Sequence, residues 1–452
     1  MYGQGRYILR HERNKHPLVL IPVISEETIK YLCGFLIWGL EIMTIHASRR
    51  ARGVEYAIRD VLIPAKALEK KGITVLKLNI GDPNAYDFDT PQHIKDALYK
   101  AANERFNGYA PSEGYLELRR AIIEREKRRN KVSYEPDDIC VTTGVTEGLQ
   151  MLLNASLDPH DELLIPGPTY PQYNVITKFA DAMPVPYHCI EKENWQPDVD
   201  DIREKISDRT KGIVLINPNN PTGALYSKKV LKEIVDVAGE HKLMVISDEI
   251  YDDLTFDGTQ QATASLTSDV PIITFNGFSK VYIMPGWRVG YAMFKHTGEL
   301  NEIQDAFMRI ARSRLCASSV CQQACIQALR GPQDHIKVMN DKLRKRRDFS
   351  YKRLNEIEGI STAKPDGAFY IFPKIEAMGK GPWKTDKEFV LDLLQEAHVL
   401  TVNGSGFCDT YGKDHFRAVI LPPMETLEQA FDAMETFMKK RLKQQCSVQN
   451  NS

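Results

Sequence analysis

The chain has 452 residues, of which 42% are hydrophobic, so it is long enough to bury a large core in two or three domains. Its 59 lysines and arginines balance 60 aspartates and glutamates, and the net charge of -1 disfavours nucleic acid or anionic membranes as partners. Small-molecule substrates remain the favoured class. The 11 histidines and 8 cysteines lack ligand or CxxC spacing, so we expect no metal site and reduced thiols in the cytoplasm.

Residues 1–42 form an N-terminal extension whose role the sequence does not indicate. Basic residues precede an apolar run at 18–24, as in a secretory signal, but no small-residue cleavage site follows, so we expect no signal peptide. The apolar stretch at 31–40 is shorter than the ~18 residues that span a bilayer, and we expect no membrane segment. A true start at Met43 would explain the extension equally well.

A helical pattern and a turn open the next part of the chain. Apolar residues at helical spacing predict a helix over 54–71, which Pro64 kinks or starts afresh. A strand at 74–78 leads into a turn at 79–83, where Gly81 either completes a plain β-turn or lets the backbone approach a ligand closely. A loop that contains Tyr109 then precedes a helix predicted over 116–129.

Strands and helices now alternate, which predicts a parallel sheet covered by helices. We expect strands near 139–143, 163–166, 213–216, 243–247 and 272–275, and a helix over 227–242 with Ser227 as its N-cap. Ligands of such sheets bind outside the carboxyl ends of the strands. The polar residues at these ends are therefore the candidates for a site.

Three of these ends carry polar motifs. Gly144, Val145 and Thr146 open a helix whose first N–H groups lack intrahelical partners and can bind a phosphate. The stretch 217–223 is so dense in Asn, Pro and Gly that it must be a turn. Asp248 and Tyr251 follow a buried strand on one side of the emerging chain.

The segment 275–291 supplies the reactive group. A buried strand leads into Ser279 and Lys280, and a lysine in a water-poor pocket becomes a neutral amine that can condense with a carbonyl. Pro285 and Gly286 interrupt the chain, so that Arg288 can return to the same pocket and bind a phosphate through two hydrogen bonds. Amine and guanidinium together indicate a phosphorylated aldehyde as the ligand.

The Ser-Lys, Pro-Gly-Trp-Arg and Gly-Tyr pattern of this segment resembles the lysine site of the class I aminotransferases, which are fold-type I enzymes dependent on pyridoxal 5'-phosphate. Within that family it is most similar to the archaeal alanine aminotransferases, and the likeness extends from about Ser48 to Lys443. The resemblance implies a large cofactor-binding domain at 91–335 and a small α+β domain made of 43–90 and 336–452. It also implies a homodimer with shared active sites.

The resemblance also assigns roles, although each residue taken alone is more often structural. Lys280 would be the catalytic residue and would form a Schiff base with the cofactor, while Asp248 would pair with the pyridine nitrogen. Tyr109 would reach the phosphate of the partner subunit. The other cofactor-binding residues would be Val145, Thr146, Tyr170, Asn220, Tyr251, Ser279 and Arg288, and the substrate carboxylate would meet Gly81, Asn220 and Arg417.

The implied reaction moves the amino group between L-alanine and 2-oxoglutarate, giving pyruvate and L-glutamate. An aspartate or aromatic aminotransferase, or a C–S β-lyase on the same fold, are alternatives. A cofactor-sensing regulator is disfavoured, since 1–42 is too short for a DNA-binding domain and lacks a helix-turn-helix pattern. Many relatives carry a hydroxyl residue where this chain has Gly277, which removes one phosphate hydrogen bond.

Two further expectations concern local structure. We expect cis X-Pro bonds at the site, and the candidates are Gly167–Pro168 and Asn220–Pro221. The basic stretch that contains Arg344, Arg346 and Arg347 is flanked by acidic residues, and we interpret it as a solvated helix face rather than a nucleic-acid patch.

Overall fold

The computed structural model describes residues 45–52, 57–295, 298–379 and 382–449, which fall in two units, Met1–Arg52 and Gly53–Ser452. In the first unit it describes the short helix α2 (Arg49–Arg52). The extension at 1–42, and with it the expectation about a signal peptide, lies outside the described residues. Across the described ranges, no helix has both the length and the apolar character needed to cross a bilayer.

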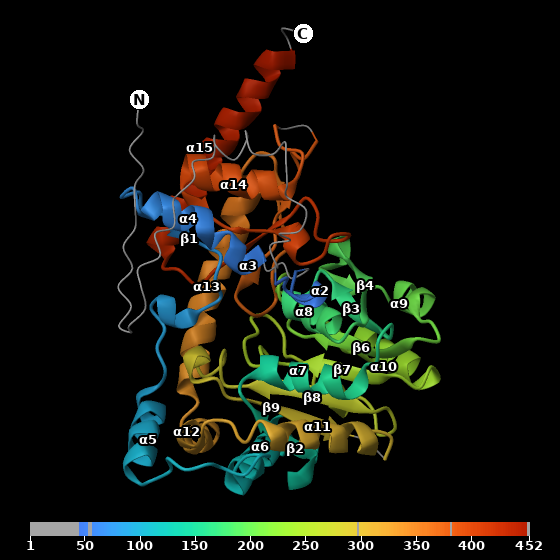
Figure 1. Ribbon diagram of the computed structural model, residues 1–452. Coiled ribbons are helices and arrows are strands. Elements are labelled where there is room, and N and C mark those ends of the chain that lie inside the picture. The colour runs from blue at the N-terminus through green and yellow to red at the C-terminus, as the bar shows by residue number, and fades with distance from the viewer. Residues whose placement is uncertain (1–44, 53–56, 296–297, 380–381, 450–452) are drawn as a thin grey trace, which may run out of the picture. The chain divides into compact units, whose positions relative to one another are not determined.

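The second unit contains an eight-stranded sheet in the order β2-β9-β8-β7-β6-β3-β4-β5, which runs through the green and yellow part of Figure 1. The five strands from β4 to β8 in this order are parallel, which confirms the predicted α/β fold. The strands are β2 (Ile139–Thr142), β3 (Glu162–Gly167), β4 (Met183–Ile190), β5 (Gln196–Pro197), β6 (Thr210–Ile216), β7 (Met244–Asp248), β8 (Ile272–Gly277) and β9 (Gly290–Lys295).

The sheet is mostly parallel, as predicted, and β9 is an exception, because it is antiparallel to both β8 and β2. The connection between β8 and β9 contains only the short 3-10 helix η5 (Pro285–Trp287). Because a parallel return needs a longer crossover, normally through a helix, the chain turns straight back. This reversal places Lys280 and Arg288 on one short connection at the edge where the parallel strands end.

Helices cover both faces of the sheet, because successive strand residues point to opposite sides. Val214 and Ile216 of β6 pack into one cluster, with α7 (Val145–Ser156), α8 (Pro171–Phe179) and α11 (Asn301–Ser313). Ile213 and Leu215 pack into the other, with α6 (Leu116–Arg129), α9 (Val199–Lys205), α10 (Lys228–Glu240) and α12 (Ser319–Arg330), and α5 (Gln92–Asn103) packs on α12.

Most predicted elements appear with small changes of extent. The helix α6 has the predicted bounds, and the Ser227 hydroxyl caps α10 by accepting from the Val230 N–H at 3.2 Å. The helix expected over 54–71 is broken at Val61 into α3 (Ala57–Asp60) and α4 (Leu62–Glu69). Pro64 lies in the first turn of α4, where its missing N–H costs no intrahelical hydrogen bond.

The C-terminal part forms small sheets and three helices. The sheets join β1 (Leu76–Lys77) with β13 (Val399–Leu400), β10 (Ile360–Ser361) with β12 (Lys374–Ile375), and β11 (Tyr370–Ile371), β15 (Phe416–Val419) and β14 (Val402–Asn403) in that order. The helices are α13 (Asp334–Glu356), α14 (Asp386–Ala397) and α15 (Met424–Gln449). Although β1 pairs with a C-terminal strand, the boundaries at 43–90, 91–335 and 336–452 stay predictions.

The prediction of a solvated helix face on the basic stretch is wrong for two of its residues. Arg346 and Arg347 of α13 are buried rather than solvated, because their guanidinium groups bond Asp87 at 2.7 Å and Asp257 at 2.7 Å. The remaining 3-10 helices are η1 (Pro83–Ala85), η2 (Pro136–Asp138), η3 (Glu191–Glu193), η4 (Thr263–Ser265) and η6 (Gly404–Gly406).

Candidate active site

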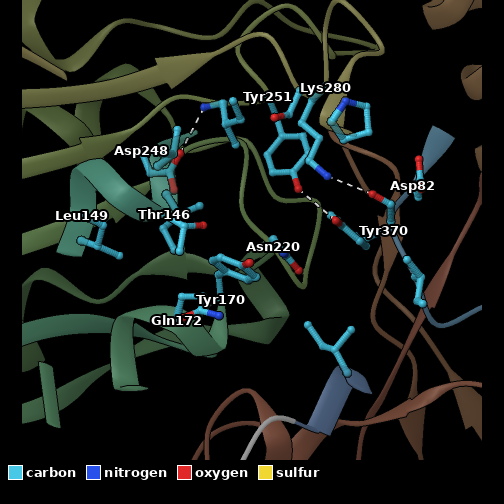
Figure 2. A pocket seen from close by; sticks show the side chains of 18 of the residues that line it. Asp82, Thr146, Leu149, Tyr170, Gln172, Asn220, Asp248, Tyr251, Lys280 and Tyr370 are labelled. Atoms are coloured by element: carbon cyan, nitrogen blue, oxygen red, sulfur yellow. Dashed lines mark hydrogen bonds between the residues drawn. The ribbon is translucent and has the colours of Figure 1, made fainter. Parts of the chain in front are cut away.

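A cavity of about 470 Å³ lies where the parallel strands end. Figure 2 shows Lys280, Tyr251 and Tyr370 converging on one side of it and Asp248, Thr146 and Tyr170 on the other. Its lining includes every residue for which the sequence predicts a role, except Tyr109: Gly81, Val145, Thr146, Tyr170, Asn220, Asp248, Tyr251, Ser279, Lys280, Arg288 and Arg417. Segments from residue 81 to residue 417 therefore meet in one space.

Lys280 follows β8 and points its amine into the cavity. The Nζ donates to the backbone oxygen of Gly81 at 2.9 Å and lies 5.4 Å from the ring centre of Phe369. Burial lowers the pKa of Lys280 to about 8, against the opposing charge of Asp82. About a tenth of this amine is therefore neutral at pH 7, and about half at pH 8, and the neutral form can act as a nucleophile or base.

Asp248 ends β7 and is 4% exposed. Its Oδ2 accepts from the Tyr173 hydroxyl at 3.0 Å, and its Oδ1 accepts from the Ile250 N–H at 3.2 Å. Burial raises the pKa of Asp248 to about 6, although both hydrogen bonds oppose this. Both donors are neutral, so this carboxylate can still pair with a cationic group of a ligand.

An anion subsite forms at the start of α7. Gly144, with φ of 76°, precedes Val145 at the helix N-terminus, where backbone N–H groups and the helix dipole favour negative charge. The Arg288 guanidinium lies directly over this turn: a Cβ added at Gly144 would be 2.5 Å from its Nη2. Ser279 and Thr146 add hydroxyl groups to the same lining, so the subsite suits a phosphate.

Arg417 of β15 forms a second cationic subsite. The side chain is 1% exposed, and its guanidinium donates to Asn220 Oδ1 at 3.0 Å and to the Asn79 backbone oxygen at 2.5 Å. The rings of Tyr370 and Phe407 lie 4.5 and 4.8 Å from the guanidinium carbon. This fixed, water-poor guanidinium can bind a carboxylate through two hydrogen bonds.

Several cavity residues were not predicted. The Tyr370 hydroxyl lies 2.9 Å from the Tyr251 hydroxyl, and a Cβ at Gly81 would be 2.3 Å from the Tyr370 oxygen, so only glycine fits there. Tyr173 lies three residues after Tyr170, and helical spacing could have indicated it. The sequence provides no signal for Arg59 or for Tyr370, which come from distant segments of the chain.

Two predicted features of the site, the position of Tyr109 and one cis peptide bond, are not found in the cavity of this chain. Tyr109 is 82% exposed and does not line the cavity of its own chain, so its role at a partner site stays a prediction. The bond Gly167–Pro168 is cis as expected, whereas the expectation for Asn220–Pro221 is wrong: the cis bond of that turn is Asn217–Pro218.

Comparisons with known proteins agree with this geometry. Residues 73–434 match the family "Aminotransferase class I and II". The chain is similar to the alanine aminotransferase from Pyrococcus furiosus, with a TM-score of 0.86 and 59% identity over 88% of this chain and 100% of that chain. It is 38% identical over 404 residues to the glutamate-pyruvate aminotransferase AlaA of Escherichia coli K12, and the matched region covers 87% of this chain and 98% of that protein. It is 35% identical over 380 residues to the aspartate aminotransferase of Bacillus subtilis, across 83% of this chain and 94% of that protein. The chain therefore belongs to the class I and II aminotransferases.

Proposed function

We propose that this chain transfers the amino group between L-alanine and 2-oxoglutarate, giving pyruvate and L-glutamate, with pyridoxal 5'-phosphate as cofactor. The observation that carries the proposal is the cavity amine of Lys280, whose pKa burial lowers to about 8. The family implies this cofactor. The names of the P. furiosus and E. coli relatives, alanine and glutamate-pyruvate aminotransferase, support the choice of substrates.

The cavity residues fit the chemical groups of this cofactor. The volume of the cavity, about 470 Å³, lies in the range of small-molecule sites. The lining offers an amine at Lys280 for the aldehyde and a carboxylate at Asp248 for the ring nitrogen. The α7 N-terminus with Arg288 offers hydrogen-bond donors for the phosphate. Tyr170 supplies an aromatic face for the ring, and Tyr251 and Asn220 supply donors for the phenolate oxygen.

When bound, pyridoxal phosphate supplies an electron sink for the pair of electrons that remains when the substrate Cα loses its proton. Lys280, whose pKa burial lowers to about 8, would accept that proton on its Nζ when it is in its neutral form. Asp248 would keep the ring nitrogen of the bound cofactor protonated through its negative charge. Arg417 and Asn220 fix the substrate carboxylate, which orients the Cα–H bond toward Lys280.

The choice of acceptor agrees with the positive charges of the cavity. Arg417 can bind the α-carboxylate, and Arg59 also lines the cavity, so it can attract the second carboxylate of 2-oxoglutarate. The same pair of arginines would suit aspartate, and the resemblance to the B. subtilis aspartate aminotransferase makes that amino acid the second candidate donor.

A panel of amino donors with 2-oxoglutarate as acceptor tests the substrate choice. We expect kcat/KM for L-alanine to exceed that for L-aspartate and L-phenylalanine, with pyruvate and glutamate formed in equal amounts. A preference for L-aspartate would instead make the chain an aspartate aminotransferase. Release of ammonia with pyruvate, in place of glutamate, would instead indicate a lyase.

We further propose a homodimer in which Tyr109 completes the phosphate subsite of the partner. Its support is that Tyr109 is 82% exposed and lies outside the cavity of its own chain. A phenol that donates to a phosphate contributes about 1.5–3 kcal/mol, so Tyr109→Phe should weaken cofactor binding without unfolding the chain.

Mixing Lys280→Ala subunits with Tyr109→Phe subunits tests the shared site. In the mixed dimer, the site that retains Lys280 receives Tyr109 from the other chain and should recover the parent affinity for the cofactor. Mixed dimers that bind the cofactor no better than Tyr109→Phe alone, or an active monomer in sedimentation, would assign Tyr109 to its own subunit.

We also place the reaction in the cytoplasm. The support is that Cys140, Cys189, Cys316, Cys321, Cys325 and Cys408 are free thiols, which reducing compartments maintain. Fractionation of the native cell tests this, and recovery of the activity outside the cytoplasmic fraction would contradict it.

A further inference from the structure

A buried tyrosine of the cavity lining donates a hydrogen bond to the cavity carboxylate. Tyr173 is fully buried, and its hydroxyl donates to Asp248 Oδ2 at 3.0 Å. It belongs to the first turn of α8, whose N-cap residue Tyr170 faces the cavity. The Thr177 hydroxyl bonds the Tyr173 backbone oxygen at 2.7 Å and helps to hold this turn. One helix start therefore supplies both a cavity wall and a donor to Asp248.

The phenol of Tyr173 is a permanent donor. Burial, and then the negative charge of Asp248, raise its pKa well above the ordinary value, so the hydroxyl keeps its proton at every working pH. A protonated phenol stabilises the charged form of the carboxylate that it bonds. Burial favours the uncharged form of Asp248, and the Tyr173 hydroxyl opposes that effect together with the Ile250 N–H.

We propose that Tyr173 is a positioning residue that keeps Asp248 ionised at neutral pH, so that the cavity presents a negative charge to a cationic ring nitrogen. Only the pairing with a ring nitrogen rests on the proposed function. The effect of Tyr173 on the charge of Asp248 is a property of the ligand-free chain. Removal of the hydroxyl leaves the Ile250 N–H as the remaining hydrogen bond, and the carboxyl of Asp248 then protonates near neutral pH.

The other groups that face Asp248 do not replace Tyr173. Lys280, after β8, adds a favourable charge that contributes less than either hydrogen bond. Tyr251, after β7, is buried and keeps its proton because burial raises its pKa well above the ordinary value. Tyr170, the N-cap residue of α8, acts on Tyr173 and raises its pKa further.

Tyr187 provides a matched control. It is also a fully buried tyrosine next to the sheet, and its hydroxyl donates to the Val214 backbone oxygen at 2.8 Å instead of to a carboxylate. It does not line the cavity. Tyr187→Phe and Tyr173→Phe thus each remove a hydroxyl from an equally buried tyrosine. Only Tyr173→Phe removes a hydrogen bond to a titratable group, Asp248.

The test measures urea unfolding of the full-length, cofactor-free chain between pH 5 and 8. Tyr173→Phe, Tyr187→Phe and the parent are each compared with their Asp248→Asn derivative, which isolates the titration of Asp248. Because the folded-state pKa of Asp248 is raised to about 6, its contribution to stability is complete at low pH and is lost as the pH rises through that value.

We expect Tyr173→Phe to raise by about one unit the pH at which the stability contribution of Asp248 is fully lost. Tyr187→Phe should leave that pH unchanged. Equal profiles for the two phenylalanine variants would overturn the proposal, as would a shift that persists with Asp248→Asn. If Tyr173→Phe does not fold, the double variant Tyr173→Phe/Asp248→Asn decides: regained folding supports the pairing, and failure to regain it contradicts the pairing.

Binding of pyridoxal phosphate separates this inference from the proposed function. Tyr173→Phe should bind it up to about tenfold more weakly than the parent at pH 7, with Tyr187→Phe unchanged. A parent chain that does not bind it refutes the proposed function and leaves the Asp248 titration standing. A parent that binds it while Tyr173→Phe titrates like Tyr187→Phe refutes this inference alone.

Discussion

Asp248 and Asp252 are two buried carboxylates four residues apart, and their environments shift their pKa values in opposite directions. Burial raises the pKa of Asp248 to about 6, and its hydrogen-bond donors are neutral. Burial acts on Asp252 too, but Arg125 and Arg129 outweigh it and lower the pKa. Arg125 reaches Asp252 at 2.6 Å, and the Asn276 amide adds a bond at 2.9 Å.

The two cations show the same contrast. Burial lowers the pKa of Lys280 to about 8, whereas the pKa of Arg125 is raised well above its ordinary value because buried acids around it outweigh its own desolvation. The cluster of Arg125, Arg129, Glu126, Asp252 and Asp253, here called the ionic cluster, pairs its charged groups directly with one another. The cavity holds charges that its protein partners satisfy only in part, and we expect a ligand to complete them.

The largest expected effect comes from removing Lys280, the cavity lysine. Lys280→Ala should lower the transamination rate by about 10³-fold or more, because it removes the group that accepts the Cα proton. Its stability in urea should stay within about 1 kcal/mol of the parent or rise, since a costly buried charge disappears. Measurable turnover close to the parent rate would end the role proposed for Lys280.

Removing Arg125, one of the two cations of the ionic cluster, should have the reverse effect. Arg125→Met leaves Asp252 buried without its nearest charge, and we expect a loss of about 3–5 kcal/mol in the free energy of unfolding. Arg330→Met is the control, because Arg330 bonds Glu124 at 2.9 Å on a more exposed surface and should cost at most about 1 kcal/mol. Equal losses in the two variants would show that the ionic cluster is not tightly paired.

A smaller effect should follow from changing the carboxylate subsite. Arg417→Lys keeps the charge but loses the planar pair of donors, so kcat/KM for the amino donor should fall by roughly 10- to 100-fold. The fall should come from KM more than from kcat, and the affinity for pyridoxal phosphate should be unchanged. A loss of cofactor affinity of similar size would place Arg417 at the cofactor instead.

The pH dependence of stability should sharpen the comparison further. Since the pKa of Lys280 is lowered from 10.5 to about 8, the unfolded chain binds more protons between these values, and stability rises with pH across this window. The cofactor-free parent should gain on the order of 1–2 kcal/mol between pH 8 and 10 relative to Lys280→Met, with the partial exposure of the side chain limiting the size. A flat difference in urea unfolding would mean that the amine is not desolvated.

The sequence predicted the parts of this arrangement that depend on local patterns. Buried strands read as apolar runs, and polar residues at their carboxyl ends must meet at one edge, which made Asp248 and Lys280 candidates and placed Asn220 in a turn at that edge. The family resemblance then supplied the role of each residue. The strand β4 was missed because Pro184 and Pro186 interrupt its apolar pattern. The antiparallel β9 was missed because its residues read as part of the lysine motif.

Contacts between distant segments that the family resemblance does not imply could not be predicted. Tyr370 meets Tyr251 across 119 residues, and Arg125 meets Asp252 across 127 residues, so no spacing rule relates them. The burial of Arg346 was hidden for the same reason, since its partner Asp87 lies 259 residues away. Local charge patterns predict solvent exposure unless a distant acid supplies the pairing.

The central claim is that Lys280 is the amine that attaches the cofactor, and borohydride reduction of the chain loaded with pyridoxal phosphate tests it most directly. The account predicts a single stable adduct, located by digestion and mass spectrometry on the peptide that contains Lys280, and its absence from Lys280→Ala. An adduct of equal yield on another lysine, or one that persists in Lys280→Ala, would contradict the account.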